Sequence, residues 1–233
     1  MSRTWARGPA ERRDERRVDL VAFDVDGTLL QHADGKVIWE ILNRAFIGDD
    51  RVNGERFRLY QQGRLSYAEW VALDVEGWRR AGATRERILE VVAAELEPVK
   101  AAHETLEELQ RRGYRLAVIS GTLDVGFDLF FSDIKFCAIY LNRITFDTTG
   151  RIEAYKATRY DMAGKAVALG EIARRESLSL ERCAFVGDHL NDVDVVRAAG
   201  LGIAFNPRSA ELVEAADVVV RASDLGALLQ YLP

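Results

Sequence analysis

The chain has 233 residues, of which 48% are hydrophobic and 30% carry a charge. This balance is typical of a globular protein with a sizeable core, and it excludes a chain that is mainly disordered. The length fits one large domain, or a core domain that carries a smaller one. The longest stretch without a charged residue, Ala198 to Pro207, has ten residues. A helix across a bilayer needs about twenty residues, so we expect no association with a membrane.

Charge and cysteine content indicate the partners and the cellular setting. The formal net charge is −5, whereas the phosphates of nucleic acids demand clustered lysines and arginines. We therefore expect no nucleic-acid partner. Cys137 and Cys183 are unpaired by their spacing, which argues against a disulfide scaffold and favours a reducing compartment. No signal peptide is recognisable before Asp19, and we expect a cytoplasmic protein.

The first residues differ in composition from the rest of the chain. Residues 2–17 hold six arginines and three acids around Gly8 and Pro9. We expect residues 1–17 to be a solvated basic tail, and an arm for an anionic partner is the alternative.

The first ordered element is expected at Val18–Phe23, where a run of apolar residues predicts a buried strand. Three helices follow. One is predicted by an apolar stripe over residues 37–46. The second opens at Ser66, which forms a capping box with a glutamate three residues later, and the third lies between Thr84 and Pro98. We therefore expect residues 33–99 to form a helical cap, without a strand of its own, between core segments 18–32 and 100–233.

From residue 100 onwards helix and strand patterns alternate. This alternation predicts an α/β fold with a parallel sheet that helices cover on both faces. Ligands of such sheets bind at the carboxyl ends of the strands. The expected elements are helix 101–112, strand 114–119, helix 124–131, strand 137–141, a hairpin within 142–155, helix 162–176, strand 183–186, a helix from about 190 to Gly200, and strands 201–205 and 217–220 with two more helices.

Polar residues cluster at three of these strand ends. Asp24 and Asp26 follow the first strand, and Asp188 follows the strand at 183–186. Three carboxylates in one crevice would raise one another's pKa values unless a divalent cation lies among them, and Mg²⁺ prefers carboxylate oxygens. Taken alone, the Asp-x-Asp-Gly-Thr segment at residues 24–28 is equally compatible with an ordinary turn.

Two further features gain meaning from their position. Ser120-Gly121-Thr122 offers a hydroxyl and backbone N–H groups at an expected strand-to-helix transition, which suits an anion; a plain helix N-cap is the alternative. Lys165 lies near the start of a predicted helix, where a cation is unfavourable unless an anion compensates it. On its own it would be taken for a surface lysine.

The combination is more specific than its parts. The order Asp-x-Asp-x-Thr, Ser-Gly-Thr, Lys and Gly-Asp-x-x-Asn-Asp, each motif in a strand–loop–helix context, resembles the haloacid-dehalogenase-like superfamily of phosphohydrolases, and within it the phosphoserine-phosphatase-like branch. The similarity runs from about Val18 to the C-terminus and includes the insert after the first motif. It implies a Rossmann-like core, Mg²⁺ dependence and an aspartyl-phosphate intermediate.

The resemblance also implies a role for each matched residue. Asp24 corresponds to the nucleophile and Asp26 to the general acid and base, while Lys165 steadies the transferring phosphoryl group. The remaining implied residues are Ser120, Gly121, Thr28 and Asn191 around the phosphate, Asp24, Asp188 and the backbone carbonyl of Asp26 at the metal, and Asp192 behind the metal ligands. Because the second acid, Asp26, is present, phosphatase or phosphotransferase chemistry is favoured.

The cap departs from the pattern of the phosphoserine phosphatases, which hold the amino acid with a cap glutamate and a cap arginine. Matching by motif puts Lys36 and Asp74 at these two positions. We therefore expect substrate contacts at Lys36 and Asp74 and a substrate other than phosphoserine, such as a sugar, polyol or nucleotide phosphate. A shift of one helical turn would instead bring Asp34 or Glu40 into the acidic position. We expect the cap aromatics to pack within the cap rather than to form a substrate wall: Trp39, Tyr60, Tyr67, Trp70 and Trp78.

The sequence thus predicts an Mg²⁺-dependent hydrolase of small phosphomonoesters that is a monomer or a homodimer. Three alternatives remain open at this point: a true phosphoserine phosphatase, a phosphotransferase, and a catalytically silent binding protein on the same fold. No catalytic group is missing, which disfavours the silent protein.

Overall fold

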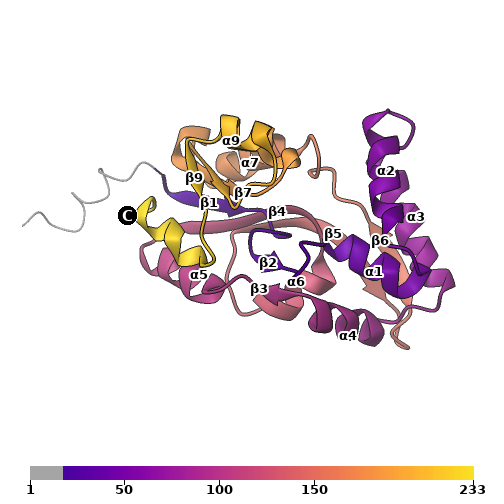
Figure 1. The fold of residues 1–233 in the computed structure, drawn as a ribbon. Helices are drawn as coiled ribbons and strands as arrows, with labels where there is room; N and C mark the ends of the chain where they lie inside the picture. The colour runs from indigo at the N-terminus through magenta and orange to yellow at the C-terminus, as the bar shows by residue number, and fades with distance from the viewer. Residues whose placement is uncertain (1–17) are drawn as a thin grey trace, which may run out of the picture.

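The computed structural model describes residues 18–233, so the expected basic tail at 1–17 lies outside the described residues. A seven-stranded sheet has helices on both of its faces, and four further helices extend beyond one end of it (Figure 1). The strand order is β6-β5-β4-β1-β7-β8-β9, and all neighbours are parallel except β5 and β6. The strands are β1 Leu20–Phe23, β4 Arg115–Leu123, β5 Ala138–Phe146, β6 Ile152–Lys156, β7 Cys183–Gly187, β8 Leu201–Phe205 and β9 Val218–Val220.

Strand β1 lies at the centre of the sheet because all four of its side chains are apolar and fully buried. It pairs with β4 on one side and β7 on the other, with Leu20 opposite both Arg115 and Cys183. The carboxyl ends of these three strands are therefore neighbours. Asp24 directly follows β1 and Asp188 directly follows β7, so the topology brings the first and last motifs to one edge.

Alternate side chains of each strand enter two separate cores. Val21 and Phe23 belong to the core beneath α5 (Ala102–Arg111), α6 (Asp124–Phe131) and the C-terminal 3₁₀ helix η4 (Leu225–Gln230). Leu20 and Ala22 belong to the core on the opposite face. The helices of that second face are α7 Lys165–Arg175, α8 Val193–Ala198 and α9 Ala210–Ala215, with the 3₁₀ turns η2 Leu180–Arg182 and η3 Leu190–Asp192. The predicted α/β architecture with two covered faces is confirmed.

The segment between β2 (Leu30–Gln31) and β3 (Glu97–Pro98) forms four helices, which we call the cap helices. They are α1 Ile38–Ile47, α2 Arg51–Gln61, α3 Tyr67–Arg80 and α4 Arg85–Glu95. The capping box of α3 is present: the N–H of Glu69 donates to Ser66 Oγ at 3.2 Å, and the N–H of Ser66 donates to Glu69 Oε2 at 2.8 Å. The sequence pattern does not predict the second helix, α2, because it has no buried residue and hence no apolar stripe.

The base of the cap corrects one expectation. Strand β3 pairs antiparallel with β2, so the segment 33–99 is not free of strands. The two chain ends of the cap lie alongside each other there, and the N–H of Val99 donates to the carbonyl of Leu29 at 2.9 Å. Such two-residue strands form because the segments that enter and leave the cap lie side by side. No alternating sequence pattern predicts them.

The far side of the cap is also attached to the core. From α3, the Arg79 guanidinium donates to the carbonyls of Ile152 and Glu153 in β6 at 3.2 and 2.8 Å. The N–H of Arg85, the first residue of α4, donates to the carbonyl of Gly150 at 2.7 Å. The predicted hairpin at 142–155 is therefore present as β5–β6, and it serves as a support for the cap.

Several element boundaries differ from the prediction. Strand β4 continues to Leu123 and α6 begins at Asp124, so Ser120 to Thr122 lie in the last residues of the strand, just before the expected transition to a helix. The register between β4 and β5 shifts between Ile119 and Leu123, which lets the strand bend as it passes the site. Helix α7 begins at Lys165 itself. Both cysteines are free thiols, and within residues 18–233 no helix has the length and apolar content to cross a bilayer.

Candidate active site

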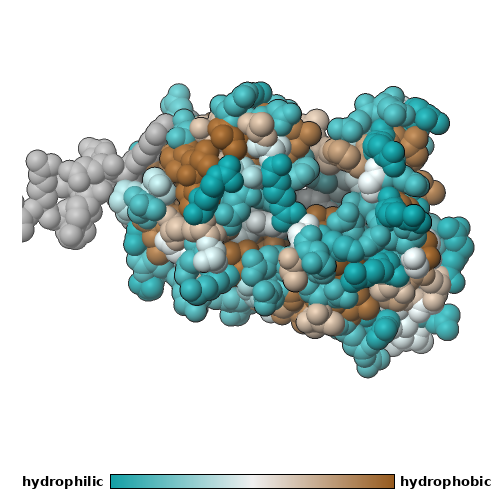
Figure 2. Space-filling model, in the orientation of Figure 1, coloured by the Kyte–Doolittle hydropathy of each residue, from teal (hydrophilic) through white to brown (hydrophobic). Residues whose placement is uncertain are grey.

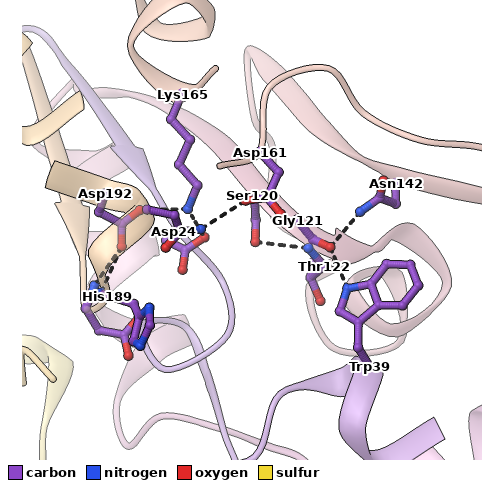
Figure 3. Close-up of polar contacts among 12 residues, drawn as sticks. Asp24, Trp39, Ser120, Gly121, Thr122, Asn142, Asp161, Lys165, His189 and Asp192 are labelled. Carbon is purple, nitrogen blue, oxygen red and sulfur yellow. Dashed lines mark hydrogen bonds and ion pairs between the residues drawn. The ribbon is translucent and has the colours of Figure 1, made fainter. Parts of the chain in front are cut away.

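Lys165 and Asp24 form the centre of the candidate site. Lys165 is 1% exposed, and its Nζ donates to Asp24 Oδ1 at 2.7 Å and to Asp192 Oδ1 at 2.6 Å (Figure 3). Burial opposes a charge on this amine, but Asp192 and Asp24 outweigh it, so the pKa of Lys165 lies above its ordinary value. The predicted lysine is therefore a buried cation held by two acids and not a surface residue.

Asp188 supplies the second acid at this edge of the sheet. Its side chain is 2% exposed, Oδ1 has no hydrogen-bond partner, and Oδ2 lies 2.9 Å from Arg208 Nε. Burial, followed by the charges of Asp24 and Asp192, raises the pKa of Asp188 well above its ordinary value. A buried carboxylate oxygen without a partner is costly unless a cation binds to it.

Oxygens of Asp24, Asp188 and Asp192 all lie within 4.8 Å of one another. Asp192 is already engaged, because its Oδ1 accepts from Lys165 and its Oδ2 accepts from the backbone N–H groups of Asp188 and His189 at 3.0 and 3.1 Å. Asp24 and Asp188 are therefore the acids whose oxygens remain for a hard divalent cation, and the donor set fits one. Asp192 orients the loop and the lysine behind them.

Gly27 allows Asp188 to approach the first motif. The glycine has φ +88°, and a Cβ at this position would lie 2.1 Å from Asp188 Oδ2. Only glycine provides both the left-handed backbone and the space that this contact needs.

Asp26 has the properties of a group that exchanges a proton near neutral pH. Burial first, and then the neighbouring charge of Asp24, raises the pKa of Asp26 to about 7. The backbone N–H of Ile38, at the start of α1, donates to Asp26 Oδ1 at 3.4 Å. The acid is thus contacted by the cap as well as by the core, which suits a general acid and base.

The second motif is held from two sides. The carbonyl of Gly121 accepts from Trp39 Nε1 of the cap at 2.8 Å and from Asn142 Nδ2 of β5 at 2.6 Å (Figure 3). The N–H of Thr122 donates to Ser120 Oγ at 3.2 Å. A Cβ on Gly121 would lie 2.0 Å from Asp161 Oδ2, so this backbone also has to be glycine.

A cavity of about 630 Å³ lies between the core and the cap helices, and Figure 2 shows the surface hollowed between the core and the end that carries α2 and α3. The core side of its lining contains the three motif ends together with Asp161 and Arg208. The cap side contains Glu40 and most of the cap aromatics. Lining residues from both sides include Asp24, Asp26, Ser120, Gly121, Thr122, Asp188, Asn191, Asp194, Trp39, Asn53, Phe57, Tyr60, Gln61, Tyr67 and Trp70.

This lining corrects three sequence-based expectations. Lys36 pairs with Asp50, Asp74 is fully buried and pairs with Arg56, and neither Lys36 nor Asp74 lines the cavity. Glu40, one turn beyond Lys36, lines it instead. Thr28 is also fully buried and absent from the lining.

The cap aromatics do more than pack against one another, contrary to the expectation from their spacing. Four of the five line the cavity: Trp39, Tyr60, Tyr67 and Trp70. Trp78 alone stays inside the cap, where its Nε1 donates to Asn43 Oδ1 at 2.8 Å.

Two lining residues are not predicted by the motifs. Asp161 accepts from Asn191 Nδ2 at 2.9 Å, so it joins the third and fourth motifs. Arg208 follows β8 and contacts both Asp188 and the carbonyl of Gly35, the latter at 2.7 Å. Asp161 lies four residues before Lys165, and this proximity to a motif is the one signal that the sequence offers. Nothing in the sequence near Arg208 indicates the contact.

Comparison with known proteins agrees with this geometry. The model of the haloacid dehalogenase-like hydrolase family matches residues 18–200. The chain belongs to this family. Among similar proteins, a phosphoserine phosphatase of Methanocaldococcus jannaschii is 27% identical over 94% of this chain and 99% of that protein. Phosphoserine phosphatases of Archaeoglobus fulgidus and Mycobacterium tuberculosis are 30% and 33% identical over 91% and 85% of this chain, and the chain spans 59% and 46% of their lengths.

Solved structures of this hydrolase family share the fold. A phospho-aspartyl intermediate analogue of phosphoserine phosphatase superposes with a TM-score of 0.73 at 26% identity, over 94% of this chain and all of the other. A hydrolase of the same superfamily from Salmonella enterica reaches a TM-score of 0.77 at 17% identity, over 94% of this chain and 73% of the other. At this lower identity the likeness concerns the fold alone.

Proposed function

We propose that this hydrolase is an Mg²⁺-dependent phosphatase of small phosphomonoesters that forms an aspartyl-phosphate on Asp24. The observation that carries the proposal is the contact of 2.7 Å between Lys165 Nζ and Asp24 Oδ1, at the base of a cavity that is lined by Asp24 and by Asp188, the acid with the unpartnered oxygen. The family match and the likeness to phosphoserine phosphatases support the same chemistry.

In the first step, a carboxylate oxygen of Asp24 attacks phosphorus and the bond from phosphorus to the alcohol oxygen breaks. Lys165 lowers the repulsion between this carboxylate and the phosphate oxygens. Ser120 and the backbone of Gly121 hold the phosphate, and Asp26 donates its proton to the leaving alcohol. A pKa of about 7 leaves a large share of Asp26 protonated at neutral pH.

In the second step, Asp26 accepts a proton from water, and the hydroxyl attacks phosphorus. The bond between phosphorus and Asp24 breaks, which restores the carboxylate and releases inorganic phosphate. Asp24, Asp188 and the backbone carbonyl of Asp26 would hold the cation, with Asp192 behind them. When bound, Mg²⁺ neutralises charge on the phosphate and on the two acids.

The proposal includes the division of the chain. Residues 18–32 and 100–233 form the catalytic core and residues 33–99 the cap, whose use is to exclude water from the bound ester. Its support is the pairing of β2 with β3, which joins the two ends of the cap at one place. The two free cysteines support a cytoplasmic location, and a monomer or homodimer remains the expected assembly.

A second candidate is phosphoserine hydrolysis itself, favoured because the similar proteins are phosphoserine phosphatases. A phosphotransferase would use the same first step with an alcohol acceptor in place of water.

The test of the main proposal is phosphate release from phenyl phosphate with Mg²⁺, compared with the same assay in EDTA. Trapping of ³²P on the wild-type chain, and its loss in Asp24→Asn, would identify the covalent step. Phosphate release without any acid-stable or trapped phosphoenzyme, and with full activity in Asp24→Asn, would disprove it.

A further inference from the structure

The cap side of the cavity has an aromatic wall, and one of its members, Tyr67, accepts from Asn142 Nδ2 at 2.7 Å. Trp70 of α3 lies at the middle of a cluster in which the ring centroids of Phe57, Tyr60 and Tyr67 are 6.2, 6.3 and 6.1 Å from its own. All four of these residues line the cavity. Aromatic rings of this kind bind alkyl groups and, through the negative faces of the rings, ammonium groups.

The ionisable residues that line the cavity are mostly acids. Six acids line it: Asp24, Asp26, Glu40, Asp161, Asp188 and Asp194. Among the described residues that line it, Arg208 is the one arginine or lysine, and it is engaged with Asp188 and the carbonyl of Gly35. Lys165 lies beneath Asp24 and faces the phosphate end. Within residues 18–233, a second negative group on the substrate therefore finds no cation on the cap side of the cavity.

Two cations that adjoin lining residues in the sequence are also engaged. Lys36 pairs with Asp50, and Arg56, on the same helix as Phe57, pairs with the buried Asp74. A carboxylate on the leaving group would meet Glu40 and neutral amides instead, and like charges in a partly closed site disfavour binding.

Glu40 is the acid that the cap contributes to this lining. It lies in the first turn of α1, where its Oε2 accepts from the backbone N–H of Val37 at 3.0 Å. This hydrogen bond orients the side chain, and a carboxylate and aromatic rings that line the same cavity suit a cationic ligand.

We propose that the substrate is the phosphate ester of an amino alcohol, whose leaving group carries an ammonium group and no carboxylate, and that Glu40 determines this specificity. The inference rests on the proposed phosphatase function. It limits the substrate to esters whose leaving group is a cation. In this it differs from the similar proteins, which are phosphoserine phosphatases.

Two matched pairs of esters test the charge requirement on the wild-type enzyme with Mg²⁺. Phosphoethanolamine differs from phosphoserine by the carboxylate alone, and phosphocholine differs from 3,3-dimethylbutyl phosphate by the charge alone. We expect kcat/KM to be about tenfold or more higher for the first member of each pair, a difference of about 1.4 kcal/mol. If phosphoserine equals or exceeds phosphoethanolamine, or the neutral ester equals phosphocholine, the inference is wrong.

The role of Glu40 is tested by Glu40→Gln, which keeps an oxygen for the N–H of Val37. We expect the ratio of kcat/KM for phosphocholine over its neutral isostere to fall to about one, mainly through KM. Glu69→Gln is the matched control, because Glu69 caps α3 in the same way and does not line the cavity. An unchanged ratio in Glu40→Gln would overturn the assignment of this residue.

Phenyl phosphate separates the specificity inference from the phosphatase proposal. If it is hydrolysed while phosphoserine leads the panel, the phosphatase proposal stands and the specificity inference fails. If neither phenyl phosphate nor any ester of the panel is hydrolysed, both fail.

Discussion

The backbone N–H of Ile38, the first residue of cap helix α1, donates to Oδ1 of Asp26 at 3.4 Å. The cap thus contacts the acid that is proposed to protonate the leaving group. An amide oxygen could accept the same hydrogen bond, so Asp26→Asn removes the proton without removing the contact.

We expect Asp26→Asn to discriminate between esters by their leaving groups. A nitrophenolate leaves without a proton, whereas an alkoxide needs one. The kcat/KM for propyl phosphate should fall by about 100-fold more than that for p-nitrophenyl phosphate. Steady-state kinetics on both esters decides the matter, and an equal loss on both would remove Asp26 from the role of general acid.

Asp24→Asn should abolish turnover and leave the fold intact. An amide is not a nucleophile toward phosphorus, and we expect a loss of kcat of at least about a thousandfold. Lys165 keeps its contact with Asp192, and the burial that raises the pKa of Asp24 no longer acts on a charge. Urea unfolding should therefore show no large drop in stability. Comparable turnover in folded Asp24→Asn protein would contradict the covalent mechanism.

Removal of divalent cations should remove activity, and Mg²⁺ should restore it. Ca²⁺ should inhibit, because its looser coordination allows a bidentate grip on the nucleophile. Asp188→Asn should raise the Mg²⁺ concentration that gives half of the maximal rate, since Asp188 carries the unpartnered oxygen. Titration of activity with Mg²⁺ measures this shift. Full activity in a chelator, with the metal content confirmed near zero, would contradict the dependence on a divalent cation.

Gly27→Ala should damage the site far more than a glycine replacement elsewhere. Its Cβ would collide with Asp188 Oδ2, and the φ of +88° adds backbone strain. Gly63 has φ +67°, and a Cβ added there would have no atom within 4 Å, so Gly63→Ala introduces strain alone, about 1–2 kcal/mol. We expect at least about tenfold lower kcat/KM in Gly27→Ala and near wild-type kinetics in Gly63→Ala. Equal kinetics in the two variants would show that the contact with Asp188 does not matter for catalysis.

Asp74→Asn should change how stability depends on pH. Burial raises the pKa of Asp74 to about 6, although Arg56 opposes the shift. The folded protein binds this proton more tightly than the unfolded chain does. Protonation of Asp74 therefore adds its full contribution to the free energy of unfolding below about pH 4, and this contribution is lost as the pH rises through 6. The stability of wild type relative to Asp74→Asn should fall by about 2 kcal/mol between about pH 4.5 and pH 7.

Urea unfolding at the two pH values tests this, with the exposed acid Asp128 replaced by Asn as the control. If the difference between wild type and Asp74→Asn is the same at both pH values, Asp74 does not titrate in this range.

The core of the protein could be predicted from the sequence because its signals are local. Strand β1 is a continuous apolar run. The first and last motifs directly follow β1 and β7 in the chain, so the ends of these strands mark them. Helix α2 and the orientation of the cap residues near the cavity could not be predicted, for physical reasons. Helix α2 exposes all of its residues to some degree, so no periodic pattern marks it. The orientation of Glu40 and Lys36 depends on the length of the loop before α1, which sequence matching does not resolve.

The contacts of Arg208 and Asp161 could not be predicted either, since they join segments far apart in the chain. Arg208 contacts Gly35, and Asp161 packs beside Gly121. Both are loop residues whose positions follow from tertiary structure and leave no periodic signal.

The way in which the cap is attached to the core bears on how a substrate enters the site. Helices α3 and α4 are fastened to the β5–β6 hairpin by Arg79 and Arg85, and the base is fastened by β2 and β3. Helix α2 is without a buried residue, yet it supplies Phe57 and Tyr60 to the cavity wall. Displacing α2 costs less packing than rotating the whole cap, so we expect α2 to be the part of the cap that moves when a substrate binds. Exchange of those eleven residues would alter which esters enter while the chemistry at Asp24 stays the same.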